Sequence, residues 1–293
     1  MPGLTPPQRI VICFNPAING AGETANELAI QVSKSDREAW LSALPDPSKQ
    51  PAEDFRRELE KADLLVCVGG DGTVLHASEH AAITGTPVFG VRMGRLGFLS
   101  EVTGEEAADA LDSVLHGVGR IERRSTVRSE VNGGSPSFAL NDVVIGRASL
   151  GRTISVGARV DNVLLAEYRA DAVVVATATG STGYALSVGG PILPPESDEV
   201  ILVPVAPHLT RANALVLSPN CEIDLYVERG FEAVMTVDGL RERPLDSGSR
   251  VVVSHGELVV DFVRIGGPNQ FYANIAERLG WLRSDHVLDT LED

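Results

Sequence analysis

The sequence places one carboxylate among three glycines where an apolar run ends, in the stretch V-G-G-D-G-T from Val68 to Thr73. Glycine allows tight turns and close approach of the backbone to a ligand. A helix that begins near Thr73 would direct unpaired N–H groups toward an anion. Asp71 could accept a proton from a hydroxyl nucleophile, or it could simply cap the helix. The candidate phosphate-binding residues are Gly69, Gly70, Gly72 and Thr73.

A second loop suited to ligand binding follows further along the chain. Four of the six residues from 177 to 182 carry hydroxyl groups, in the order T-A-T-G-S-T. An expected strand at 172–176 precedes them, and a short helix is expected from about 182 to 187. Hydroxyl groups such as those of Thr179, Ser181 and Thr182 would then face a ligand together with a helix N-terminus. A helix cap rich in Ser and Thr is the alternative structural interpretation.

The elements expected to position the first loop alternate between strands and helices. Apolar runs predict strands at residues 10–14, 64–68 and 86–91. Helical spacing predicts helices at 23–32, 55–61, 73–83 and 105–115. Strands separated by helices of this length form parallel sheets through right-handed crossovers. The first part of the chain is therefore predicted to be an α/β domain.

The pattern changes near residue 125, where we place a domain boundary. Apolar and polar residues alternate at 154–160 and 221–227, and the pair His255-Gly256 is expected to separate two short strands. This pattern is typical of antiparallel sheets with one buried face. The tail returns to helical spacing, with Ile275, Leu279 and Leu282 on one side, which indicates a helix that packs on another part of the chain. The predicted units are 1–125, 126–268 and 269–293.

The bulk composition narrows the function classes. The chain has 293 residues, 43% of them hydrophobic, and a formal net charge of −15, which argues against nucleic acid as a partner. No apolar run reaches the ~18 residues of a membrane span. The N-terminus lacks an apolar signal segment, so we expect a cytoplasmic protein with no membrane partner. Because an anionic chain repels phosphate compounds, such a ligand would need backbone N–H groups, a few arginines or a divalent cation.

Other potential metal ligands favour a structural interpretation. Cys13, Cys67 and Cys221 lie in apolar or alternating runs without metal-ligand spacing, which is typical of reduced core residues. His76 and His80 lie four residues apart, but the glutamate of the zinc-binding pattern H-E-x-x-H is absent. We therefore predict no metal site built from protein side chains.

Several motifs together resemble the NAD kinase family. The G-G-D-G-T loop is similar to one shared by NAD kinases, diacylglycerol and sphingolipid kinases and, more distantly, phosphofructokinases. The segment T-G-S-T-G-Y-A-L-S-V-G-G-P, residues 179–191, resembles the NAD kinase signature T-G-S-T-A-Y-S-L-S-A-G-G-P. Similar pieces stand at 94–101 (G-R-L-G-F-L-S-E), 140–145 (L-N-D-V-V-I), 204–208 (P-V-A-P-H) and 237–239 (V-D-G). They occur in the family order over nearly the whole chain.

The resemblance implies a fold, an activity and partners. The fold would be a Rossmann-like N-terminal α/β domain and a β-rich C-terminal domain, with the last helix packed on the first domain and NAD in the cleft between domains. The activity would be transfer of the γ-phosphoryl group of ATP to the 2′-hydroxyl of the adenosine ribose of NAD, giving NADP. Mg²⁺ or another divalent cation would arrive with the nucleotide, and polyphosphate is an alternative donor. The chain would form a homodimer or homotetramer.

The resemblance also implies roles for individual residues. Asp71 matches the family aspartate that contacts the ribose hydroxyl and is its proposed general base. Asn141 matches a residue that grips the adenine-side nucleotide, Asp171 one near the nicotinamide end, and Arg169 a basic residue of members that favour oxidised NAD over NADH. The predicted NAD-binding set is Gly72, Asn141, Asp142, Arg169, Asp171, Thr182, Gly183, Tyr184 and Ser187.

The sequence departs from the family pattern at several positions. Asp142 replaces the usual Glu, Gly183 replaces Ala, and Leu240 replaces the Gln of D-G-Q. Two other hypotheses therefore stay open. One is a kinase of the same superfamily that acts on another hydroxyl, such as that of a lipid or a sugar. The other is a non-catalytic NAD(P)-binding regulator, against which the retained Asp71 argues.

Overall fold

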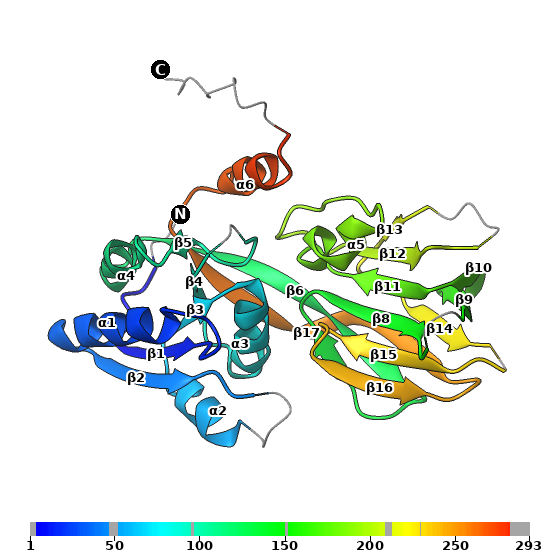
Figure 1. Ribbon diagram of the computed structural model, residues 1–293, viewed down its shortest axis with the longest axis horizontal. Coiled ribbons are helices and arrows are strands. Elements are labelled where there is room, and N and C mark those ends of the chain that lie inside the picture. Colours follow the sequence, from blue (N-terminus) through cyan, green and yellow to red (C-terminus); the bar gives the residue numbers. More distant parts are fainter. Residues whose placement is uncertain are drawn as a thin grey trace.

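The computed structural model describes residues 4–46, 52–94, 97–149, 152–208, 213–228 and 230–281. In the N-terminal half, parallel strands in the order β4-β3-β1-β2 are connected through helices (Figure 1). The strands are β1 (Arg9–Phe14), β2 (Glu38–Ala43), β3 (Leu64–Gly69) and β4 (Val88–Arg92), and the short β5 (Val102–Thr103) pairs with β4. The helices are α1 (Ala21–Lys34), α2 (Glu53–Leu59), α3 (Asp71–Thr84) and α4 (Ala107–Leu115).

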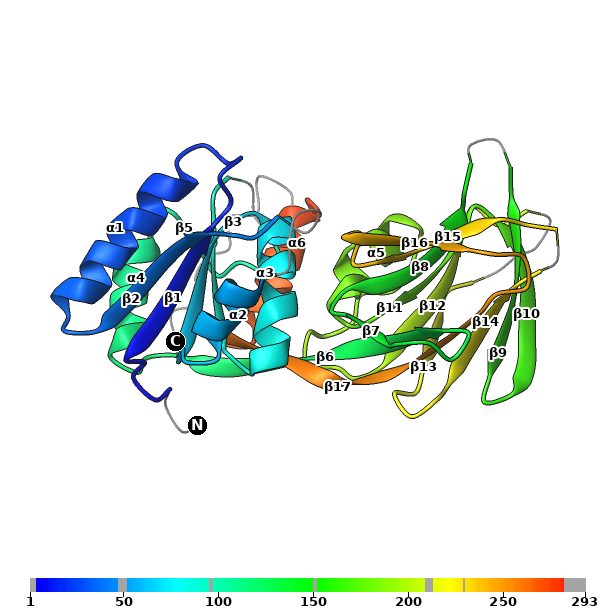
Figure 2. The same ribbon diagram turned by 90° about the horizontal axis from the view of Figure 1, so that it is seen from below.

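Helices cover both faces of this parallel sheet (Figure 2). Because successive side chains of a strand point to opposite faces, Ile12 of β1 packs in the apolar cluster of α1 and α4, whereas Val11 packs in that of α2 and α3. Burial on both faces explains why β3 is a continuous apolar run. All strands and helices predicted for this half are present, with ends that differ by at most two residues.

Strand β2 is not predicted by the sequence pattern. It lies at the edge of the sheet, where it pairs with β1, and none of its six residues is fully buried. An edge strand with half-exposed side chains needs no apolar run. Its sequence, E-A-W-L-S-A, therefore carries no strong strand signal.

The C-terminal half consists of two packed antiparallel layers. Within the described residues, one layer is a six-stranded sheet in the order β13-β12-β11-β8-β15-β16, and the other contains β10, β9, β14, β17, β6 and β7. Their inner faces share one apolar cluster, in which Ile145 and Leu225 are fully buried. The strands are β6 (Arg120–Val131), β7 (Ser137–Ala139), β8 (Asp142–Arg147), β9 (Ile154–Val160), β10 (Val163–Ala170), β11 (Ala172–Ala176), β12 (Val200–Val205), β13 (Leu215–Leu217), β14 (Ile223–Val227), β15 (Ala233–Val237), β16 (Arg241–Leu245) and β17 (Arg250–Arg264).

Two long antiparallel strands, β6 and β17, run through both halves (Figures 1 and 2). At its beginning β17 pairs with β14 of the C-terminal half, and near its end Phe262 pairs with Val88 of β4. A single sheet therefore continues from one half into the other. The predicted boundary at residue 125 falls inside β6. The architecture confirms the predicted fold, an α/β N-terminal part and a β-rich C-terminal part.

The prediction that His255-Gly256 separates two strands is wrong. Both residues lie within β17, which is continuous from Arg250 to Arg264. Its register against β6 shifts between His255 and Val259, which marks an irregularity of the bulge type. Because β6 provides a partner on both sides of this shift, the ladder resumes and the chain does not turn.

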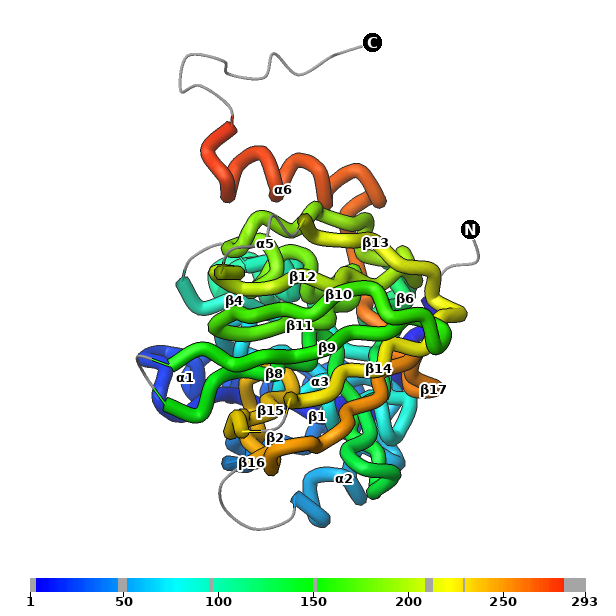
Figure 3. The backbone as a smooth tube through the Cα atoms, turned by 90° about the vertical axis from the view of Figure 1, so that its right-hand side faces the viewer, coloured from blue at the N-terminus to red at the C-terminus, as the bar shows by residue number. Residues whose placement is uncertain are grey.

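Three short helices complete the described chain. The hydroxyl-rich loop contains a 3-10 turn, η1 (Gly180–Thr182), followed by α5 (Tyr184–Ser187). Helix α6 (Gln270–Arg278) lies at the periphery (Figures 1 and 3), buries Ile275, and places Arg278 over the ring of Phe98. Leu282 of the predicted tail lies outside the described residues. None of the helices in the described ranges has the length and apolarity that a membrane crossing requires.

Candidate functional site

The glycine loop, residues 69–73, connects β3 to α3. Gly70 is the N-cap of α3 and has extended backbone angles, so the helix begins at Asp71, earlier than predicted. The Thr73 hydroxyl accepts hydrogen bonds from the Gly70 N–H at 3.3 Å and from Asn15 Nδ2 at 3.2 Å, and it is buried inside the turn. A Cβ at Gly69 would lie 2.5 Å from that hydroxyl oxygen, whereas Gly70 and Gly72 face open space. Gly70 and Gly72 are therefore the loop residues that a ligand can approach.

Asp71 is held by the backbone of a distant segment. Its carboxylate accepts hydrogen bonds from the N–H groups of Phe98 at 2.8 Å and Leu99 at 3.3 Å. Arg278 Nη1 lies 3.5 Å from Asp71 Oδ2, and the Asp71 side chain keeps 32% of its surface exposed. Since Gly70 occupies the cap position and these amides belong to another segment, the alternative interpretation of Asp71 as a helix cap is wrong. The carboxylate is fixed in orientation and remains accessible.

Gly97 makes this contact possible. A Cβ at position 97 would lie 1.9 Å from Asp71 Oδ1, closer than any two such atoms can approach. The motif G-R-L-G-F-L-S-E therefore supports Asp71 through its second glycine and the two amides that follow. Arg95 and Leu96 of the same motif lie outside the described residues.

The hydroxyl loop, residues 177–182, uses most of its hydroxyl groups internally. Thr177 donates to the carbonyl of Leu140 at 2.5 Å, and Ser181 donates to the carbonyl of Ala178 at 2.6 Å. Thr177, Thr179 and Ser181 are all buried. The expectation that Thr179 and Ser181 present hydroxyl groups to a ligand is therefore wrong. Their hydrogen bonds shape the turn that carries the next residues to the surface.

The residues that follow the turn are accessible. Thr182 is half-buried and donates to the carbonyl of Thr179 at 3.0 Å, and Ser187 is exposed and donates to the carbonyl of Tyr184 at 2.7 Å. The Tyr184 ring is 42% exposed. Burial raises the pKa of the Tyr184 hydroxyl, and the charges of Asp171 and Asp142 raise it further. A Cβ at Gly183 would meet the Gly180 carbonyl at 3.4 Å, so the structure has room for the family alanine.

Asn141 lies directly under the hydroxyl loop. A Cβ at Gly180 would lie 2.0 Å from the Asn141 carbonyl oxygen, which in turn accepts a hydrogen bond from the Thr177 N–H at 2.9 Å. Gly180 is thus required for close contact between the two segments. The structure brings Asn141, Thr182, Gly183 and Tyr184 together from two motifs that are far apart in sequence.

Two carboxyl groups, those of the buried Asp142 and the half-buried Asp238, support this arrangement. Asp238, at a positive φ of 53°, accepts the N–H groups of Leu140, Asn141 and Asp142 at 2.7–3.0 Å. Burial raises the pKa of Asp142 to about 7, and the negative charge of Asp238 adds to the effect. Burial also raises the pKa of Asp238 to about 6, although its three N–H donors oppose the change. Asp238 belongs to the V-D-G motif but was not among the predicted site residues.

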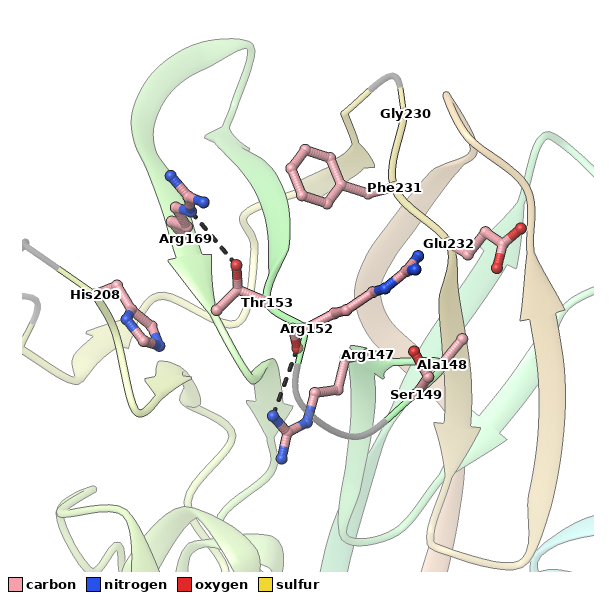
Figure 4. A pocket seen from close by; sticks show the side chains of 10 residues that line it. All are labelled: Arg147, Ala148, Ser149, Arg152, Thr153, Arg169, His208, Gly230, Phe231 and Glu232. Carbon is pink, nitrogen blue, oxygen red and sulfur yellow. Dashed lines mark hydrogen bonds between the residues drawn. The ribbon is translucent and has the colours of Figure 1, made fainter.

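Arg169 and Asp171 lie at the far end of this region, beside a basic cavity. Arg147, Arg152 and Arg169 line a cavity of about 760 Å³ (Figure 4). Arg169 Nε donates to Thr153 Oγ1 at 3.4 Å, and Arg147 forms an ion pair with Asp171 at 3.1 Å. In a chain with a net charge of −15, this is a local concentration of positive charge. The Arg169 side chain lines the cavity, whereas Asp171 is engaged in its ion pair with Arg147.

The histidine pair on α3 has a structural environment. His80 accepts a hydrogen bond from Arg56 Nε at 3.1 Å, packs edge-on against Phe55, and contacts the ring of His76. Burial lowers the pKa of His80 to about 4, helped by the positive charges of His76 and Arg56. Among the described residues, no group of three or more His, Cys, Asp or Glu side chains is arranged to hold a metal ion.

The first half is an α/β unit in which the G-G-D-G-T loop leads into a helix, and the second half is β-rich and carries the hydroxyl loop. This combination indicates a two-domain kinase. Residues 11–119 match the model of the ATP-NAD kinase N-terminal domain. Residues 140–265 match the model of the ATP-NAD kinase C-terminal domain. The chain belongs to the NAD kinase family.

Individual relatives agree with this assignment. The chain is 35% identical to an NAD kinase of Chloroflexus aurantiacus over 93% of its length and 98% of the relative. It is 38% identical to an NAD kinase of Heliobacterium modesticaldum, over 82% of this chain and 86% of the relative.

Two solved structures resemble the structure of this chain. An Archaeoglobus fulgidus NAD kinase in complex with ATP superposes with a TM-score of 0.76 at 25% identity, over 94% of this chain and all of that one. A yeast NADH kinase complexed with NADH gives a TM-score of 0.83 over 95% of this chain and 89% of that one. At 23% identity, the yeast structure shows the shared fold.

Gly97→Ala is expected to destabilise the protein by about 1–3 kcal/mol, because the new methyl group must displace the Asp71 carboxylate or the backbone around it. The free energy of unfolding from urea titration measures the effect. Gly267→Ala is the matched control, since a Cβ there meets nothing within 4 Å. Equal stability of the two variants would contradict the contact.

The acidic pair is expected to make stability fall as pH rises. The folded pKa values of Asp142 and Asp238, about 7 and about 6, exceed the unfolded value near 3.8. The native state therefore binds more protons than the unfolded state between pH 4 and 7. This contribution to stability is complete below pH 4 and is lost as pH passes 7; for the two groups together it is on the order of 7 kcal/mol.

Asp142→Asn should flatten this dependence in urea titrations from pH 4.5 to 7.5, because it removes one titrating group and the charge that perturbs the other. The control is Asp246→Asn, at an exposed aspartate in a turn. An unchanged slope in Asp142→Asn would show that the pair does not titrate in this range.

Proposed function

We propose that the protein transfers the γ-phosphoryl group of ATP to the 2′-hydroxyl of the adenosine ribose of NAD and so produces NADP. Family membership supports phosphorylation of NAD. The observation that carries the chemical proposal is the Asp71 carboxylate, held by two backbone amides beside the accessible end of α3.

The proposed step makes one bond and breaks one bond. The ribose 2′-oxygen attacks the γ-phosphorus, the bond between that phosphorus and the bridging oxygen of ADP breaks, and the hydroxyl proton passes to Asp71. A hydroxyl is a weak nucleophile at neutral pH, so a positioned carboxylate assists late in the transfer. Most of the acceleration would come from alignment and from neutralisation of phosphate charge. The open space at Gly70 and Gly72 supports approach of phosphate oxygens to the N–H groups of α3.

Mg²⁺, or another divalent cation, is proposed to accompany the triphosphate. The cation would neutralise the negative charge of the phosphates. The chain is anionic and has no P-loop lysine, so it does not supply that positive charge on its own. The side chains at the glycine loop fit a cation carried by the nucleotide, because Asp71 is a single carboxylate already engaged by amides.

The NAD-binding set remains a prediction, and the structure supports it unevenly. Asn141, Thr182, Gly183 and Tyr184 lie together and are reachable from solvent. Asp142 is buried, so its contribution would be to support Asn141 and Tyr184. The preference for NAD over NADH, for which Arg169 is the candidate residue, also stays a prediction, as does the choice between ATP and polyphosphate.

We also propose that the chain assembles into a homodimer or homotetramer. Strand β10 lies at the open edge of its sheet, and Val163, Leu164 and Leu165 are exposed along it. An exposed apolar edge strand is a ready surface for pairing. Light scattering of the purified protein would measure the assembly. A cytoplasmic location stays a prediction.

Asp71→Asn is expected to keep NAD affinity within a few-fold and to lower turnover at least ~100-fold, because it removes the proton acceptor and keeps the side-chain shape. Turnover is measured as NADP formed from NAD, ATP and Mg²⁺ with an NADP-specific dehydrogenase. Asp54→Asn is the matched control, since Asp54 lies in the first turn of α2 and is exposed.

The same assay separates the remaining hypotheses. Wild-type protein that binds NAD tightly but forms no NADP would favour the non-catalytic regulator. Consumption of ATP with a lipid or sugar acceptor, and none with NAD, would favour the kinase of another hydroxyl. Near-normal turnover of Asp71→Asn would show that Asp71 is structural.

A further inference from the structure

A cluster of charged side chains is buried where β6 and β17 pass from one half of the molecule to the other. The charged cluster consists of Glu122 and Arg124 on β6 and Arg264 on β17, each 3–5% exposed. Both guanidinium groups also lie near the ring of Phe262, with Arg124 at 5.2 Å and Arg264 at 5.0 Å from its centroid. None of these residues takes part in the proposed chemical step.

Glu122 joins the two arginines. Its Oε1 accepts hydrogen bonds from Arg124 Nε at 3.0 Å and Nη2 at 2.6 Å, and from Arg264 Nε at 3.0 Å. Its Oε2 accepts a hydrogen bond from Arg120 Nη2 at 3.0 Å. Burial alone would raise the pKa of Glu122, but the charges of Arg264 and Arg124 outweigh it and lower the pKa to about 2. Glu122 is therefore ionised at neutral pH.

Each arginine also reaches one of the two functional segments. Arg124 Nη1 donates to Thr179 Oγ1 of the hydroxyl loop at 3.4 Å. Arg264 Nη1 donates to the carbonyl of Leu99 at 2.9 Å and to Glu101 at 3.2 Å. The N–H of the same Leu99 bonds to the Asp71 carboxylate. A continuous path of polar contacts thus runs from Thr179 through the charged cluster to Asp71.

The energetics suggest why charged groups occupy this junction. Removing several charges from water costs free energy that their attraction often fails to recover, so an apolar set of similar volume would hold two halves together at least as well. Hydrogen-bonded charges add direction, because the planar guanidinium group fixes the geometry of its partners. Cohesion alone therefore does not account for the charged cluster, whereas fixing of relative orientation does.

We infer that Glu122, Arg124 and Arg264 are positioning residues that set the hydroxyl loop relative to the Asp71 carboxylate. The inference rests on the proposed function, since it assumes that NAD contacts the hydroxyl loop while Asp71 receives the proton. Catalysis of phosphoryl transfer depends on alignment, and a displacement of about 1 Å can cost ~100-fold in rate. Loss of the Arg124 contact with Thr179, or of the Arg264 contact with Leu99, should therefore lower kcat more than it weakens NAD binding.

The test uses conservative variants of the full-length protein. Arg124→Lys and Arg264→Lys keep the charge but lose the planar fork, and each is expected to lower kcat at least ~10-fold while Kd for NAD changes less than ~3-fold. Arg123→Lys is the matched control. Arg123 bonds to Asp261 through two contacts of 2.8 and 3.0 Å between the same two strands, but its side chain is 66% exposed and lies outside the charged cluster.

A milder variant keeps the test decisive if a buried lysine prevents folding. Thr179→Val removes the hydroxyl acceptor of Arg124 and leaves every charge in place. Thr179→Val is expected to lower kcat several-fold. The double variant Arg124→Lys with Thr179→Val should be no slower than Arg124→Lys alone, because both substitutions break the same contact between Arg124 and Thr179. Independent, multiplying losses in the double variant would overturn the inference.

The outcomes also separate this inference from the proposed function. A wild-type protein that forms no NADP removes the function on which the inference depends. An active wild type with unchanged kcat in Arg264→Lys and Thr179→Val overturns the inference alone. If activity falls only in proportion to the loss of folded protein, measured by thermal melting, the residues have a structural role and the inference is overturned. If activity falls only because NAD binds more weakly, they have a binding role and the inference is also overturned.

Discussion

The continuous pairing of β6 with β17 is the constraint on which the rest of the structure depends. The two strands supply side chains to the cores of both halves: Val253 packs between the sheets of the C-terminal half, and Val263 packs with the helices of the N-terminal half. The halves are thus joined by a hydrogen-bonded ladder, which is stiffer than a linker. A site that takes one loop from each half needs this stiffness, because the relative position of the two loops follows from how the halves are joined.

Positive groups at short range compensate for the negative net charge of the chain. The chain is strongly anionic, yet the proposed ligands are anions, so attraction must come from groups placed at short range. The N-terminus of α3, Arg278 beside Asp71, and the three arginines of the cavity in Figure 4 are such groups. The N-terminus of α3 directly follows the end of β3, and Arg147 is the last residue of β8.

Local determinants explain why the glycine loop could be predicted from sequence and much of its environment could not. A buried strand, a glycine turn and a helix are encoded in consecutive residues, and in the structure they begin and end within two positions of the prediction. The amides that hold Asp71 come from Phe98 and Leu99, and those gathered by Asp238 come from 140–142. These contacts depend on how strands pair, which the sequence pattern does not specify. For the same reason the buried hydroxyl groups of the loop and the continuity of β17 were not anticipated.

The carboxyl groups of the site differ in their exposure and in their hydrogen-bond partners, and these differences suggest different roles. Asp71 is accessible and receives hydrogen bonds from backbone amides. Asp142 is buried and Asp238 is half-buried, and their pKa values are raised to about 7 and about 6. Asp238 accepts three backbone N–H groups of the segment 140–142 and so holds that segment in place. Of these three carboxyl groups, Asp71 is the accessible one and is placed to take a proton from a substrate. The replacement of Glu by Asp at 142 is consistent with this division, because the shorter side chain stays in the buried layer next to Asp238 and leaves the surface to Asn141 and Tyr184.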